Sequence, residues 1–186
     1  MPKRDAPLIL VERCEVMKIN GKEPQIGEGC FLAPSADIIG DVVIGDGSTV
    51  WFQCVLRGDV GPIEIGKNTN IQDGTVIHGT HKKWDVKIGD NVTVGHQAML
   101  HGCHIGDEAF VGMGSILLDG SRMAPRSFLA AGSLLTEGAE TETGWMYMGR
   151  PAKAVRKLKE DELNFLRQSA NNYLMYKSWY DPEEEL

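Results

Sequence analysis

Aliphatic residues recur at every sixth position through most of the chain. The series runs through Ile26, Leu32, Ile38, Ile44, Val50, Leu56, Ile65, Ile71, Ile77, Ile88, Val94, Leu100, Ile105, Val111, Leu117, Met123, Leu129 and Leu135. Neither an α-helix nor an alternating β-strand gives a period of six. A glycine often follows the aliphatic residue, and a small residue often stands four positions after it. This pattern is typical of a hexapeptide parallel β-helix.

The period also predicts how the chain is divided. Three hexapeptides close one triangular coil, and six coils stacked about 4.8 Å apart give a prism roughly 29 Å tall. We expect residues 26–150 to form this β-helix, so the fold is mainly β. Residues 1–25 then form an N-terminal cap, with a strand-forming stretch from Leu8 to Ile19 that ends at the Asn20-Gly21 turn. Residues 151–186 form a C-terminal amphipathic helix of roughly 159–179 and an acidic tail.

Composition narrows the class of partner. The chain has 19 basic and 26 acidic residues, and its net charge of −7 argues against a nucleic acid or an anionic membrane as a partner. No apolar stretch approaches the roughly 20 residues of a membrane span, and no signal-peptide core is present. We therefore expect a cytoplasmic protein. Cys30 and Cys54 stand at inward positions and read as small buried hydrophobic residues.

The six-residue period is interrupted in three intervals. These are Leu56–Ile65, Ile77–Ile88 and Leu100–Ile105. Counted in coils of three hexapeptides, all three intervals fall at the same corner of the prism. One explanation is that this corner tolerates insertions, and the other is that it carries the functional site.

Histidines near this corner favour the second explanation. His78 and His101 occupy equivalent positions one coil apart, so their Cα atoms should lie about 5 Å from each other. Two imidazoles at that separation can bind one zinc ion. His96 lies on another face, so a neighbouring copy in a threefold assembly would have to supply it. A single histidine in a strand is more often an ordinary surface residue. His81 is expected to be solvent-exposed, and His104 stands at an inward position with its role open.

Several segments carry a family resemblance. They are Val55-Leu-Arg-Gly-Asp59, Thr69-Asn-Ile-Gln-Asp-Gly74, Val76-Ile-His78, Val92-Thr-Val-Gly-His96, Leu100-His-Gly-Cys103, Val111-Gly-Met-Gly114, Gly149-Arg-Pro-Ala-Lys153 and Ser169-Ala-Asn-Asn-Tyr173. In this order the segments resemble the γ-class carbonic anhydrase-like family of hexapeptide-repeat proteins. The resemblance implies a left-handed β-helix, a homotrimer, and a Zn²⁺ ion, or another divalent metal such as Fe²⁺ or Co²⁺. The ion would be held by His78 and His101 of one chain and His96 of the next.

The resemblance also implies an activity, the hydration of CO₂ to bicarbonate by metal-bound hydroxide. Arg57 and Asp59 match residues that pair across the subunit interface, although locally they equally form an ordinary surface ion pair. Gln72 matches a residue that orients the metal-bound water or the substrate. Asp73 matches a residue that supports the interface network. Tyr147, after the repeats, is a further candidate catalytic residue.

Two proton-relay glutamates of the most active relatives are missing. Val60 stands at the first position, and the loop 79–87 has no glutamate, which leaves His81 or Asp85 as substitutes. Metal binding can therefore be intact while turnover is weak or absent. Two alternatives stay open, a coenzyme A-dependent hexapeptide acyltransferase with a histidine as general base, and a non-catalytic trimeric scaffold joined by zinc.

Overall fold

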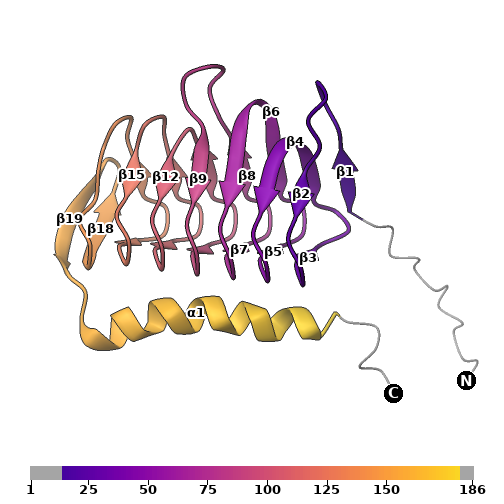
Figure 1. The fold of residues 1–186 in the computed structure, drawn as a ribbon. Coiled ribbons are helices and arrows are strands. Elements are labelled where there is room, and N and C mark those ends of the chain that lie inside the picture. The colour runs from indigo at the N-terminus through magenta and orange to yellow at the C-terminus, as the bar shows by residue number, and fades with distance from the viewer. Residues whose placement is uncertain (1–13, 181–186) are drawn as a thin grey trace, which may run out of the picture.

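A parallel β-helix followed by one long α-helix makes up the described part of the molecule (Figure 1). The computed structural model describes residues 14–180. The predicted mainly β architecture with a C-terminal helix is confirmed. The predicted strand residues 8–13 and the acidic tail lie outside the described residues.

The strands form two sheets. The eight-stranded sheet contains β3 (Phe31–Leu32), β5 (Thr49–Val50), β7 (Asn70–Ile71), β10 (Thr93–Val94), β13 (Phe110–Val111), β16 (Phe128–Leu129), β18 (Trp145–Gly149) and β19 (Ala152–Lys157). The eleven-stranded sheet contains β1 (Glu15–Met17), β2 (Gln25–Ile26), β4 (Asp37–Ile44), β6 (Val55–Ile65), β8 (Val76–His78), β9 (Val86–Ile88), β11 (Met99–His101), β12 (His104–Ile105), β14 (Ile116–Leu117), β15 (Arg122–Met123) and β17 (Leu134–Leu135).

The six-residue series forms the core of the β-helix. Strands of successive coils pair in parallel, so that Ile71 aligns with Val94 and Val94 aligns with Val111. From Ile38 to Leu135, every aliphatic residue of the series is buried. Stacking in register therefore gives each coil a continuous apolar interior, as the period predicts.

The first coil departs from this pattern. Ile26 is 37% exposed and Leu32 is half-buried, although Ile26 aligns with the buried Ile44 of β4 as the six-residue series predicts. No described coil covers this end of the β-helix, and an end coil has a neighbour on one side only. The strand β1 pairs instead with β4, and the expected turn follows it at Asn20 and Gly21, which both have positive φ.

The opposite end extends further than predicted, because the β-helix has about seven turns instead of six. Strand β18 adds the extra layer, with Tyr147 aligned on Leu129 of β16. Tyr147 is buried and belongs to the same core cluster as the aliphatic series. Strand β19 then pairs antiparallel with β18 and ends the sheet.

The three interruptions of the period all lie within the eleven-stranded sheet, at one corner, as predicted. Strand β6 runs through the first of them. The second is the loop 79–85 between β8 and β9, which projects beyond the other corners (Figure 1). The third is the tight connection from β11 to β12. The second and third interruptions therefore begin directly after His78 and His101, which end their strands.

The helix α1 (Glu160–Ser178) agrees closely with the predicted range and starts with a fixed geometry. Two N–H groups of Arg156 donate to the two carboxylate oxygens of Glu162, each at 2.7 Å. The backbone N–H of Lys159 donates to the same carboxylate at 2.8 Å. These bonds satisfy part of the free backbone at the helix start and link it to β19.

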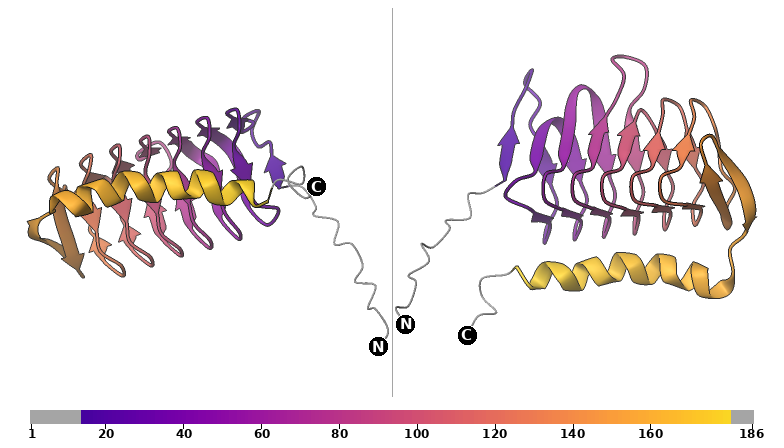
Figure 2. Two further views of the ribbon diagram at one scale, coloured as in Figure 1. Left: turned by 90° about the horizontal axis from the view of Figure 1, so that it is seen from below. Right: turned by 180° about the vertical axis from the view of Figure 1, so that it is seen from behind.

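The helix runs along the length of the β-helix, beside the eight-stranded sheet (Figure 2). Leu166 and Ala170 are buried against it, and Ser169 accepts a hydrogen bond from the Thr93 hydroxyl at 3.0 Å. Two long side chains add contacts to separate coils. Arg167 donates to Glu108 at 3.0 Å. Near the other end of α1, Lys177 donates to the backbone carbonyl of Gly29 at 2.7 Å.

Gly45, Gly66 and Gly89 stand at equivalent positions of successive coils, where the backbones approach closely. A Cβ atom on Gly66 would lie 2.6 Å from the backbone carbon of Gly89, so Gly66→Ala forces neighbouring coils apart. We expect Gly66→Ala to destabilise the protein by about 1–3 kcal/mol, the usual cost of overpacking. The measurement is urea unfolding followed by circular dichroism. Gly61→Ala is the control, because its Cβ would meet no atom closer than 3.4 Å. Equal losses in both variants would contradict this explanation.

The Arg156–Glu162 pair predicts a pH dependence. Hydrogen bonds from Arg156 and from the Lys159 backbone lower the pKa of Glu162 from 4.5 to about 2. A lowered pKa stabilises the fold above pH 4.5, and this contribution is lost as the pH falls toward about 2. We expect Glu162→Gln to lower the melting temperature slightly at pH 7, with the difference from wild type shrinking below pH 4.5. Glu160→Gln, which removes a neighbouring charge, is the control in the same thermal scans.

Candidate metal centre

His78 and His101 are aligned on adjacent strands. Strand β11 pairs with β8 so that His101 lies opposite His78, which confirms the predicted register. One coil earlier, Arg57 of β6 lies opposite His78. Parallel strands place residues of equal register on the same face. The two imidazoles therefore share one outer face of the β-helix, with a guanidinium beside them.

The two imidazole rings turn one nitrogen each toward the other. Nδ1 of His78 lies 3.3 Å from Nε2 of His101, and the ring centroids are 5.3 Å apart. The other two nitrogens contact carboxylates, with His78 Nε2 at 3.1 Å from Asp59 and His101 Nδ1 at 2.6 Å from Asp119. When both outer nitrogens donate their protons to these carboxylates, the inner nitrogens present two facing lone pairs. Such a pair is stable only with a proton or a cation between them.

The carboxylates beside this pair are held in the ionised form. Burial acts to raise the pKa of Asp59, but hydrogen bonds from Arg57 and His78 outweigh it and the pKa is lowered. Burial also acts to raise the pKa of Asp119, and hydrogen bonds from Thr80 and His101 lower it overall. Thr80 donates its hydroxyl to Asp119 at 2.7 Å from the loop 79–85. Both aspartates thus favour a histidine tautomer with the outer nitrogen protonated.

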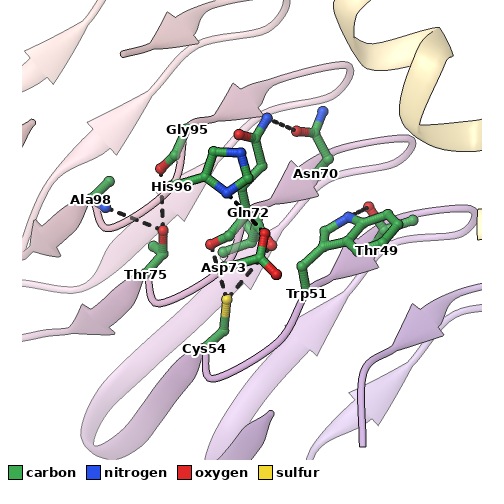
Figure 3. A network of polar contacts seen from close by, with 11 residues as sticks. Thr49, Trp51, Cys54, Asn70, Gln72, Asp73, Thr75, Gly95, His96 and Ala98 are labelled. Atoms are coloured by element: carbon green, nitrogen blue, oxygen red, sulfur yellow. Dashed lines mark hydrogen bonds and ion pairs between the residues drawn. The ribbon is translucent and has the colours of Figure 1, made fainter. Parts of the chain in front are cut away.

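His96 lies on a different face. It follows β10 of the eight-stranded sheet, whereas His101 belongs to β11 of the eleven-stranded sheet. Its Nδ1 lies 2.8 Å from a carboxylate oxygen of Asp73, and its side chain is 42% exposed (Figure 3). No described residue hydrogen bonds to its Nε2. His96 therefore has the same arrangement as the other two histidines, with an aspartate at one nitrogen and the second nitrogen available.

The remaining histidines differ. His104 contacts Asp85 through Nε2 at 2.8 Å and accepts from Arg122 at Nδ1 at 2.9 Å, so both ring nitrogens are engaged. The prediction that His104 points inward is wrong, because it directly precedes the buried Ile105 and alternation turns it outward. His81 is exposed, as predicted.

Gln72 lies one coil before Gly95, the residue that directly precedes His96. Strand β7 aligns Ile71 with Val94, which places Gln72 beside Gly95 (Figure 3). Its side chain is buried, and its amide N–H donates to Asn70 at 3.0 Å. This bond fixes the orientation of the amide and leaves the amide oxygen without a partner among the described residues.

Two other predicted site residues have local roles. Arg57 donates to Asp59 within the chain, which is the local ion pair that the sequence left open. Tyr147 does not lie beside the histidines. It is buried three coils beyond the Val94 layer, and its hydroxyl accepts from the backbone N–H of Glu142 at 3.1 Å. We therefore leave Tyr147 out of the candidate site.

One chain does not assemble the three histidines. Among residues 14–180, no group of three or more His, Cys, Asp or Glu side chains is placed to hold a metal ion. The donor set nevertheless fits a divalent metal, because each of the three histidines keeps one lone pair free while an aspartate holds the opposite nitrogen.

Comparisons with known proteins agree with the repeat pattern and the motifs. Residues 23–58 match the family described as "Bacterial transferase hexapeptide (six repeats)". A protein named "Carbonic anhydrase" from Geobacillus kaustophilus is 44% identical over 160 residues, covering 86% of this chain and 87% of that protein. The chain belongs to the γ-class carbonic anhydrase-like family.

Two further similar proteins show how much of their length this chain matches. "Gamma carbonic anhydrase 2, mitochondrial" of Arabidopsis thaliana is 47% identical over 164 residues, and the chain spans 59% of that protein's length. A solved hexapeptide transferase family protein from Anaplasma phagocytophilum is 46% identical with a TM-score of 0.85, covering 89% of this chain and 97% of that one. Within residues 14–180, no helix has the length and apolar character that a membrane span requires.

Sequence reasoning missed Asp119 and Thr80. Asp119 follows the buried Leu117 by two positions and reaches back one coil to His101. A search for carboxylates shortly after the third aliphatic residue of each coil would have found it, because Asp59 follows Leu56 in a similar way. Thr80 carries no such signal, since its position depends on the conformation of the loop.

Proposed function

We propose that the protein is a metal-dependent carbonic anhydrase-like enzyme whose sites form between subunits of a homotrimer. The observation that carries this proposal is the His78–His101 pair, whose inner nitrogens lie 3.3 Å apart while aspartates hold the outer ones. Two ligands from one chain leave a tetrahedral zinc site incomplete. His96 of a neighbouring subunit supplies the third, because in its own chain it lies on another face.

The residues of the chain divide the work at such a site. Asp59, Asp119 and Asp73 each hold the proton of one histidine at the nitrogen away from the metal. A divalent ion held by His78, His101 and the neighbouring His96 would lower the pKa of water and so supply hydroxide at neutral pH. The amide oxygen of Gln72 accepts a hydrogen bond from water or from the bicarbonate hydroxyl. Its own amide group is kept in place by Asn70.

Proton transfer out of the site is expected to limit the rate of the proposed enzyme. Val60 cannot carry a proton, and Asp85 is held by His104 at 2.8 Å and by Lys87 at 3.5 Å. His81 is therefore the one titratable group of the loop 79–85 that is exposed and not held by another described residue, apart from the lysines. We expect CO₂ hydration to be slow compared with relatives that carry relay glutamates.

The acyltransferase and scaffold alternatives predict different behaviour. An acyltransferase would be stabilised by acetyl-coenzyme A without any bound metal, whereas the proposed enzyme would be stabilised by zinc. A scaffold would contain zinc and lose its trimer with a chelator, yet show no hydration of CO₂. Metal analysis, thermal shift and stopped-flow CO₂ hydration on one preparation separate the three.

Subunit mixing tests the shared site. Chains carrying His96→Ala lack one ligand, and chains carrying His101→Ala lack another, so a trimer of both restores complete sites. Random mixing should return about a quarter of the sites, because each site needs one chain of each kind in a fixed order. Zinc content after co-refolding is the measurement. The control mixes His78→Ala with His101→Ala, which restores nothing if both ligands come from one chain. Restoration in the control and none in the first mixture would reject the shared site.

The role of Asp119 predicts a graded loss of metal. We expect Asp119→Asn to weaken zinc binding by roughly 10- to 100-fold, the usual effect of losing a carboxylate behind a ligand histidine. Asp85→Asn is the matched control, because it removes a carboxylate from His104, a histidine with no free nitrogen. Competition with a zinc-binding dye gives both affinities. Equal affinities in the two variants would contradict the assignment.

A further inference from the structure

A pocket is lined in part by Asp73, the aspartate that contacts the proposed metal ligand His96. It has a volume of about 230 Å³ and lies where the C-terminal end of α1 meets the corners after β5 and β7. Its walls are almost entirely aromatic. They consist of Trp51, Phe52, Tyr173, Tyr176, Trp179 and Tyr180.

The rings form a connected set instead of a random group. Trp51 meets the rings of Tyr173 and Tyr180 edge-on, with centroids 5.4 and 5.5 Å apart. Tyr176 extends the wall, with its ring 4.9 Å from that of Trp179. The indole N–H of Trp51 donates to Thr49 at 2.9 Å, which fixes the central ring. The pocket thus has a firm base on the β-helix and a wall from the helix.

One charged side chain lines this pocket, the carboxylate of Asp73. One of its oxygens contacts His96 at 2.8 Å, and no described residue hydrogen bonds to the other. Figure 3 shows the carboxylate between His96 and the Trp51 ring. Burial raises the pKa of Tyr173 to about 12, and the negative charge of Asp73 acts in the same direction. The carboxylate therefore acts on the pocket as well as on the histidine.

Aromatic walls with a single carboxylate select a particular kind of ligand. Aromatic faces attract cations, and cages of such rings hold quaternary ammonium groups. A primary ammonium carries three N–H groups that each need an acceptor. A quaternary ammonium has none, so apolar walls and one counter-ion satisfy it. Its methyl groups also bury apolar surface against the rings.

We propose that this pocket binds the quaternary ammonium group of a small molecule, with Asp73 as its counter-ion. The inference goes beyond CO₂ hydration, because neither CO₂ nor bicarbonate is a cation. Asp73 joins the two sites, since the same carboxylate contacts the pocket and His96. An occupant would therefore lie next to the proposed metal ligand without needing the metal.

Choline and its neutral isostere 3,3-dimethylbutan-1-ol test the inference. The two have nearly the same shape, so the charge is the only large difference. We expect isothermal titration to show that choline binds and that the isostere binds about tenfold more weakly. The difference arises because the neutral isostere loses the cation–π attraction to the rings and the ion pair with Asp73. Titrations use the protein as purified and after treatment with EDTA, and choline should bind in both. No choline binding, equal binding of the isostere, or binding lost with the metal would overturn the inference.

Variants of the wall assign the binding to this pocket. Trp179 is 69% exposed, so its replacement is not expected to disturb the fold. Trp179→Phe keeps an aromatic face and should retain binding, whereas Trp179→Leu should weaken it by about fivefold. Asp73→Asn keeps the shape, removes the charge and should weaken choline but not the isostere. Phe165→Leu, an exposed aromatic residue of α1 outside the pocket, is the control. Equal choline affinity in Trp179→Leu and wild type would reject this site.

Discussion

Parallel stacking of the coils in strict register is the constraint on which the rest of this structure depends. Because each coil places equivalent residues one above another, a side chain in one coil has its counterpart directly above and below. In the interior this gives the continuous apolar column from Ile38 to Leu135. On the outside it gives the column in which Arg57, His78 and His101 follow one another.

The same register determines which charged residues contact each histidine, and therefore which histidines keep a ring nitrogen free for a metal. All three candidate ligands have an aspartate at one ring nitrogen, and each of those aspartates comes from a neighbouring coil of the same chain. His104 also has an aspartate, but the guanidinium of Arg122 takes its second lone pair. His104 thus differs from the candidate ligands because Arg122, one coil away, donates to its second ring nitrogen.

The six-residue period predicts the features that recur in every coil, and it does not predict contacts made by segments outside the repeat. The core, the corner with its irregular loops, the helix and the His78–His101 register follow from position alone. Asp119 stands at a position that the register could have indicated, because it follows the third aliphatic residue of its coil. Thr80 could not be predicted, because its contact with Asp119 depends on the path of the loop 79–85, which no period constrains. The sequence places Tyr147 after the repeats, where it could reach the site, whereas in the structure it belongs to the last layer of the core.

The helix α1 changes the way in which the whole molecule holds together. A stack of coils that touch only their neighbours tends to fray from its ends, since each interface opens almost independently. Arg167 binds the coil of Glu108, and Lys177 binds the first coil at Gly29. Because one continuous helix binds both coils, opening of the first coil also breaks contacts with α1, which favours a single cooperative transition.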